Sequence, residues 1–121
     1  MKKRKTILVV DDDPQFRELY RTALQFEGFA VATASDGVAA LQAIESDPPA
    51  LVILDLNMPC LDGWGVLREL AAHEQTKAIP VIVVTSADVS LGVERAAAIL
   101  QKPVSPDELM PLITEYVREK Y

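Results

Sequence analysis

The sequence has little that could form covalent cross-links, membrane spans or a positively charged surface. Its single cysteine, Cys60, has no partner for an internal disulfide, so the fold does not need an oxidising compartment. No apolar run approaches the roughly 20 residues of a membrane-spanning helix. The formal net charge of −6 argues against a dedicated nucleic-acid binder. We therefore expect no membrane and no direct nucleic-acid partner.

The rest of the composition is that of an ordinary globular domain. Half of the residues are hydrophobic and a quarter are charged. A length of 121 residues suits one domain and is too short for two, so residues 1–121 are predicted to form a single domain. Only five residues separate the basic opening MKKRK from three aspartates, too few for the apolar region of a signal peptide. We expect a cytoplasmic protein.

Apolar runs alternate with helical patterns along the chain. The predicted strands are Thr6–Val10, Phe29–Ala34, Leu51–Leu54, Ile79–Thr85 and Ile99–Gln101. The predicted helices are Phe16–Leu24, Ser35–Ser46, Asp62–His73, a short Ser90–Ala98 and a last one from Pro106 to Val117. Alternation of this kind is typical of an α/β domain whose parallel sheet has helices on both faces.

Polar side chains come where the apolar runs end. Asp11, Asp12 and Asp13 follow the first predicted strand, Asp55 follows the third, Thr85 ends the fourth, and Lys102 follows the fifth. The carboxyl ends of parallel strands meet at one edge of a sheet, where ligands bind in such folds. Asp13 precedes a proline and fits a helix N-cap. Each of the others alone could be an ordinary turn or surface residue, but their joint placement predicts a site.

Carboxylates that lie this close together repel one another unless a cation intervenes. Oxygen ligands of this kind suit Mg²⁺, which also pairs well with phosphoryl oxygens. A carboxylate can act as a nucleophile and form an aspartyl phosphate, whose charge a hydroxyl and an ammonium group would stabilise. The end of a buried strand is a costly place for a carboxylate, and this chemistry gives Asp55 a reason to be there.

The segments ILVVDDDP, LVILDLNMPCLDGWGVL, VIVVTSA and QKPVSP together resemble the receiver domains of two-component response regulators. The resemblance covers nearly the whole chain. It implies a flavodoxin-like, doubly wound sheet of five parallel strands in the order 2-1-3-4-5. It also implies a phosphoacceptor switch and not an enzyme. Such a switch at most phosphorylates itself from small donors and slowly loses the group.

The resemblance also implies a role for each site residue. Asp55 would accept a phosphoryl group from a phosphohistidine on a histidine kinase or histidine phosphotransfer protein. The metal site would consist of Asp11, Asp12, Asp55 and the backbone carbonyl of Asn57, with Mg²⁺ as the cofactor. Thr85 and Lys102 would each contact a phosphoryl oxygen, and Lys102–Pro103 would be a cis peptide. The downstream partner is unknown.

Two features depart from the family pattern. The family usually has an aromatic residue three positions before the lysine, and here that residue is Ile99. The segment between Thr85 and Lys102 is short by roughly one helical turn, which predicts a shortened fourth helix. Both departures concern the output surface, which is the face built from helix four, strand five and helix five that changes on phosphorylation in this family. We therefore expect a monomer whose structure changes little around Ile99 on phosphorylation.

Two other classes of protein remain open at this stage. A haloacid-dehalogenase-type phosphohydrolase also uses a strand-end aspartate, but it needs an acid–base aspartate two positions later, where this chain has Asn57. An interaction module could instead keep the receiver fold and act largely independently of phosphorylation. The intact acidic set argues against such a module, and the altered output surface argues weakly for it.

Overall fold

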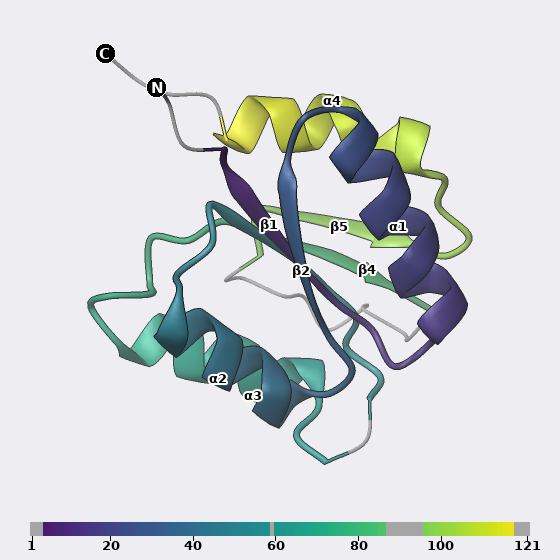
Figure 1. Cartoon of the computed structure of the whole chain (residues 1–121). Coiled ribbons are helices and arrows are strands. Elements are labelled where there is room, and N and C mark those ends of the chain that lie inside the picture. Colours follow the sequence, from purple (N-terminus) through teal and green to yellow (C-terminus); the bar gives the residue numbers. More distant parts are fainter. Residues whose placement is uncertain (1–3, 59, 87–95, 118–121) are drawn as a thin grey trace.

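The computed structural model describes residues 4–58, 60–86 and 96–117, and it is built around one five-stranded parallel sheet (Figure 1). The strands are β1 (Thr6–Val10), β2 (Ala30–Ala34), β3 (Leu51–Leu54), β4 (Val81–Thr85) and β5 (Ala98–Gln101). The described helices are α1 (Pro14–Phe26), α2 (Gly37–Ser46), α3 (Gly63–Ala72) and α4 (Pro106–Val117). The strand order is β2-β1-β3-β4-β5, so the predicted fold class is confirmed.

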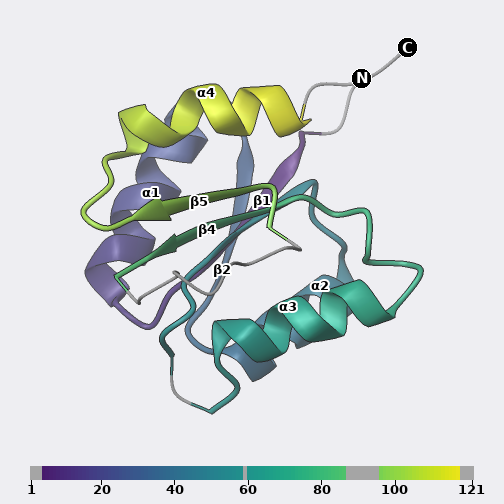
Figure 2. The ribbon, with the colours of Figure 1, turned by 180° about the vertical axis from the view of Figure 1, so that it is seen from behind.

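The helices form a layer on each face of the sheet, α1 and α4 on one and α2 and α3 on the other (Figures 1 and 2). Consecutive strand residues point to opposite faces, so a strand covered on both faces must be apolar throughout. In β3, Leu51 and Ile53 pack with the α1/α4 layer, whereas Val52 and Leu54 pack with the α2/α3 layer. This double burial explains why LVIL is an uninterrupted apolar run.

Helix α1 extends two residues beyond the predicted Phe16–Leu24 at each end. The Asp13 carboxylate caps its first turn by accepting a hydrogen bond from the Gln15 N–H at 2.9 Å, and Pro14 occupies the first helical position. Gly28 follows the helix with a φ of 99°, a left-handed conformation that favours glycine. The cap at Asp13 therefore starts the first turn of α1 directly after Asp11 and Asp12.

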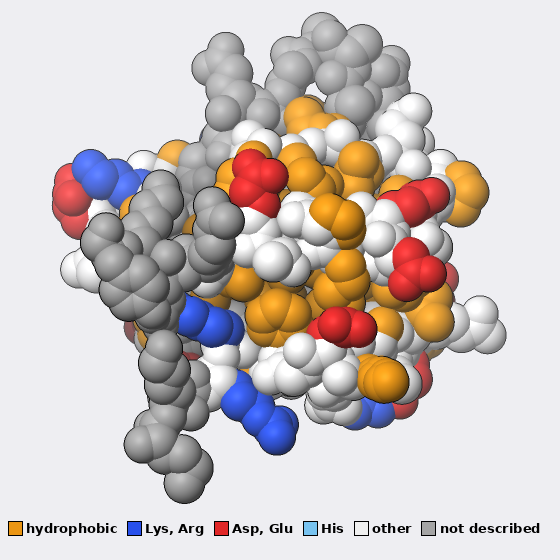
Figure 3. All heavy atoms as spheres, turned by 90° about the horizontal axis from the view of Figure 1, so that it is seen from above, with side chains coloured by type: hydrophobic (Ala, Val, Ile, Leu, Met, Phe, Trp, Pro, Cys, Tyr) orange, Lys and Arg blue, Asp and Glu red, His pale blue; other side chains and the backbone are white. Residues whose placement is uncertain are grey.

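The surface on the side of α4 and the C-terminal end of α1 mixes acidic and hydrophobic side chains (Figure 3). Helix α1 exposes Leu19 and Phe26 to solvent. None of the described helices is long and apolar enough to cross a membrane.

The prediction that a helix extends to Ala98 is wrong, because Ala98 is the first residue of β5. Ala98 pairs with Ile82 of β4, and the Ala97 N–H already donates to the Val81 carbonyl at 2.8 Å. Pairing with the neighbouring strand outweighs the helix propensity of three alanines. Ala96 and Ala97 are not helical either. Residues 90–95 of the predicted fourth helix, and with them the prediction that this helix is shortened, lie outside the described residues. Strands β2 and β4 each begin one or two residues later than predicted.

Candidate functional site

Asp55 lies immediately after β3, and it is 5 % exposed. Its Oδ1 accepts hydrogen bonds from the Thr85 hydroxyl at 2.8 Å and from the Asn57 N–H at 3.1 Å. Its Oδ2 lies 3.4 Å from the Lys102 ammonium. Donors from three separate segments therefore converge on this carboxylate, which offsets the cost of burying a charge.

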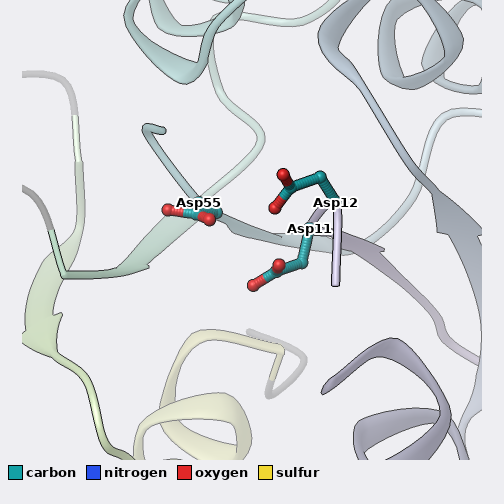
Figure 4. Close-up of side chains that lie close together, drawn as sticks. All are labelled: Asp11, Asp12 and Asp55. Carbon is teal, nitrogen blue, oxygen red and sulfur yellow. The ribbon is translucent and has the colours of Figure 1, made fainter. Parts of the chain in front are cut away.

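Asp11 and Asp12 extend from the end of β1 toward Asp55 (Figure 4). Each of the three carboxylates offers an oxygen within 4.8 Å of the others. Asp11 is fully buried, and its Oδ1 accepts a hydrogen bond from the Asp13 N–H at 2.9 Å, whereas Asp12 is exposed. The cluster is therefore accessible to solvent from the Asp12 side and closed at Asp11.

Lys102 reaches both buried carboxylates from the end of β5. Its Nζ donates to Asp11 Oδ2 at 2.7 Å and lies 3.4 Å from Asp55 Oδ2. Its backbone N–H donates to the Thr85 carbonyl at 2.9 Å, which extends the pairing of β4 with β5. The peptide bond between Lys102 and Pro103 is cis, as predicted.

Burial and charge pairing oppose each other in this cluster. Burial raises the pKa of Asp11 above its ordinary value, although hydrogen bonds from Lys102 and Asp13 counteract the rise. Burial alone would lower the pKa of Lys102, but the hydrogen bond and charge of Asp11, together with the charge of Asp55, raise it overall. The raised pKa of Lys102 keeps the lysine charged between the two acids. The hydrogen bonds to Asp11 do not fully offset the effect of its burial, so the pKa of Asp11 stays raised.

The donor set fits a hard divalent cation. Three carboxylates that offer oxygens within 4.8 Å of one another, one of them exposed, match the oxygen ligands and partial hydration that Mg²⁺ requires. Asn57 lies beside them and contacts Asp55 through its N–H. The role of its carbonyl as a ligand stays a prediction. All six predicted site residues are therefore brought to one edge of the sheet, and their individual roles stay predictions.

Two glycines hold the loop that follows Asp55 against its neighbours. A methyl group on Gly63 would collide with the Asp55 carbonyl oxygen, and one on Gly37 would collide with the Leu61 carbonyl oxygen. The Gly63 N–H donates to the Leu56 carbonyl, and the Gly37 N–H donates to that of Leu61, both at 3.0 Å. The backbone around Asp55 is therefore fixed by close contacts that only glycine permits.

We predict that Gly63→Ala lowers the free energy of unfolding by about 1–3 kcal/mol, because the added methyl group overpacks against the Asp55 backbone. Urea denaturation measures this loss. Gly65→Ala in the same helix is the matched control, since its methyl group would meet side-chain atoms of Leu61 and Arg68 and no backbone of a neighbouring segment. An equal or larger loss in the control would contradict the account.

Two contacts of α1 with the site were not predicted. The Phe16 ring lies under the Lys102 ammonium, which is 4.6 Å from the ring centroid. Arg17 Nη1 donates to the Asp11 carbonyl at 2.7 Å. The sequence pattern assigned Phe16 to the apolar stripe of the helix. The signal that could have identified both residues is their position in the first turn after the aspartates, which must lie at the same sheet edge.

Comparisons with known proteins agree with this geometry. The family model described as "Response regulator receiver domain" matches residues 7–114. Response regulator MprA of Mycobacterium ulcerans is 41% identical over 119 residues, which are 93% of this chain and 50% of MprA. DNA-binding response regulator MtrA of Mycolicibacterium smegmatis is 38% identical over 120 residues, 95% of this chain and 51% of MtrA. The chain thus spans about half the length of these relatives.

Solved structures also resemble the chain closely. The chemotaxis protein CheY4 of Vibrio cholerae has a TM-score of 0.86 at 26% identity, covering 94% of this chain and 99% of CheY4. A CheY-like response regulator receiver domain protein from Methanospirillum hungatei has a TM-score of 0.84 at 29% identity, covering 95% of this chain and 94% of that protein.

Proposed function

Because the chain belongs to the family of response regulator receiver domains, we propose that Asp55 accepts a phosphoryl group from a phosphohistidine and that the phosphorylated chain binds a partner differently. One observation carries the proposal. The Asp55 carboxylate lies at a sheet edge between the hydroxyl of Thr85, the ammonium of Lys102 and the acid pair of Asp11 and Asp12.

In the proposed reaction, an Asp55 oxygen attacks the phosphorus of the donor as the phosphorus–nitrogen bond breaks. The electron pair of that bond goes to the imidazole nitrogen of the donor, which takes up a proton. The Asp55 carboxylate loses its charge as it becomes an acyl phosphate, and the phosphoryl oxygens bring their own negative charge from the donor into the site. Thr85 and Lys102, which now donate to Asp55, are within reach to follow that charge.

A divalent cation held by Asp11, Asp12 and Asp55 would supply charge neutralisation for the phosphoryl oxygens. Asp11 is positioned for this by the hydrogen bond from the Asp13 N–H and by burial against the sheet. The Lys102 ammonium and the Asp13 N–H contact the two oxygens of Asp11, so the exposed Asp12 provides the open side of the cluster. Mg²⁺ remains the proposed ion.

Incubation with acetyl phosphate and Mg²⁺ tests the proposal. Intact-mass spectrometry should detect one added phosphoryl group, and hydroxylamine should remove it because an acyl phosphate is labile to that nucleophile. Absence of any incorporation would contradict the proposal and favour the receiver-fold interaction module. Sustained hydrolysis of external phosphoesters would favour a phosphohydrolase, which Asn57 at the acid–base position argues against.

The proposed partners are a histidine kinase or histidine phosphotransfer protein upstream and an unidentified protein downstream. The net charge of −6 supports the expectation that the chain does not itself bind nucleic acid. A cytoplasmic location and a monomeric state are likewise expectations from the sequence.

We predict that the phosphorylated domain stays monomeric. Ile99 lies in β5 opposite Val83, half-buried against the α2/α3 layer, and its β-branched side chain is stiff and lacks a ring that could change position. A switch needs two discrete packings, which this side chain does not offer. Sedimentation with the phosphoryl mimic beryllofluoride and Mg²⁺ checks the oligomeric state. A tight dimer that Ile99 substitutions disrupt would refute this prediction.

A further inference from the structure

The Lys102 ammonium is held by more than the two carboxylates. Asp11 Oδ2 and Asp55 Oδ2 lie 2.7 Å and 3.4 Å from Nζ, and the Phe16 ring centroid lies 4.6 Å away. A cation over an aromatic face is attracted by the quadrupole of the ring. The ring therefore attracts the ammonium while its N–H groups stay available to donate hydrogen bonds to the two carboxylates.

Phe16 is itself fixed in place. Its ring stacks on that of Tyr20, with 4.2 Å between the centroids and 21° between the planes. Tyr20 is fully buried, and its hydroxyl donates to the carbonyl of Val104, two residues after Lys102. A closed chain of contacts thus runs from Lys102 through Phe16 and Tyr20 to the backbone beside Lys102. Movement of the ring would require this whole arrangement to change.

Phe16 and Lys102 also line one open hollow together. A pocket of about 400 Å³ is lined by Asp13, Phe16, Lys102, Pro103 and Val104. Loss of the aromatic ring would enlarge this hollow and expose more of the partly exposed Lys102 side chain to water. A hydrated lysine has many accessible rotamers, so it would spend less time between Asp11 and Asp55.

We propose that Phe16 is a positioning residue that holds the Lys102 ammonium at the Asp11–Asp55 carboxylate pair. The proposal rests on the proposed function in one respect, since it takes Lys102 to stabilise the incoming phosphoryl group. The ring keeps the lysine in place before the donor arrives, so the reaction does not bear the entropic cost of ordering it.

The first test is spectroscopic and does not depend on phosphorylation. A methylene group held over a ring is shifted upfield by the ring current, so the terminal methylene protons of Lys102 should be shifted upfield in wild type. The shift should persist in Phe16→Tyr and disappear in Phe16→Leu. Phe29→Leu is the matched control, because Phe29 packs in the same hydrophobic cluster but precedes β2, away from the site. Random-coil lysine shifts in wild type would overturn the proposal.

The second test measures the rate of phosphoryl incorporation from acetyl phosphate at a temperature where every variant is folded. Phe16→Leu should slow incorporation about three- to tenfold, Phe16→Tyr should restore most of the rate, and Phe29→Leu should leave it unchanged. Equal slowing by both leucine variants would show that Phe16 acts only through general core packing, and it would overturn the proposal. If wild type incorporates nothing, the proposed function fails, and the methylene shifts alone decide whether Phe16 holds Lys102.

Discussion

Replacing Asp55 with asparagine should reduce phosphoryl incorporation below detection. The amide lacks a nucleophilic oxygen of comparable charge, so the covalent step has no acceptor. The amide oxygen can still accept the hydrogen bonds from Thr85 and from the Asn57 N–H, so the local structure should survive. The measurement is the intact mass after incubation with acetyl phosphate and Mg²⁺.

Asp62→Asn is the matched control for this substitution. Asp62 caps α3 by accepting a hydrogen bond from the Gly65 N–H at 3.0 Å, and asparagine caps helices equally well. The control should therefore be phosphorylated like wild type. Full labelling of Asp55→Asn would show that another residue is the acceptor.

Mg²⁺ should stabilise the folded chain substantially. Asp11, Asp12 and Asp55 repel one another in the folded state, and an ion that binds only there stabilises it by mass action. At a hundredfold excess over the dissociation constant, the free energy of unfolding should rise by about 2.7 kcal/mol, which is roughly 10 °C in the midpoint of a thermal melt. Melts with and without Mg²⁺ measure the difference.

Asp12→Ala should lose most of that difference, because it removes the exposed ligand through which the ion reaches the cluster. Asp47→Ala removes an exposed carboxylate at the end of α2, and its melts should respond to Mg²⁺ as wild type does. Equal midpoints with and without saturating Mg²⁺ in wild type would count against a metal site.

Sequence patterns predicted the fold well where burial dictates the residue type. The run Leu51–Leu54 must be apolar because both of its faces are covered, and it is the third strand as predicted. Because the strands are parallel, their carboxyl ends share one edge. Asp11, Asp55 and Thr85 could therefore be assigned to one site before any distance was known.

The remaining features depend on contacts between distant segments. The start of β5 at Ala98 is decided by pairing with β4, which the alanine-rich sequence does not reveal. The contact of Phe16 with Lys102 joins residues 86 positions apart, and an aromatic residue in an apolar helical stripe carries no sign of it. Gly63 lies in the first turn of a predicted helix, and nothing in the sequence pattern shows that its backbone packs against the Asp55 carbonyl.

The residue that carries the phosphoryl group is the most direct test of the central claim. Borohydride reduces an aspartyl phosphate to homoserine, so reduction of the phosphorylated chain followed by peptide mass spectrometry marks the acceptor. We predict homoserine at position 55 and unmodified aspartate at Asp11 and Asp12. Homoserine at Asp11 or Asp12, or a phosphoryl group that survives reduction on another residue type, would contradict the account.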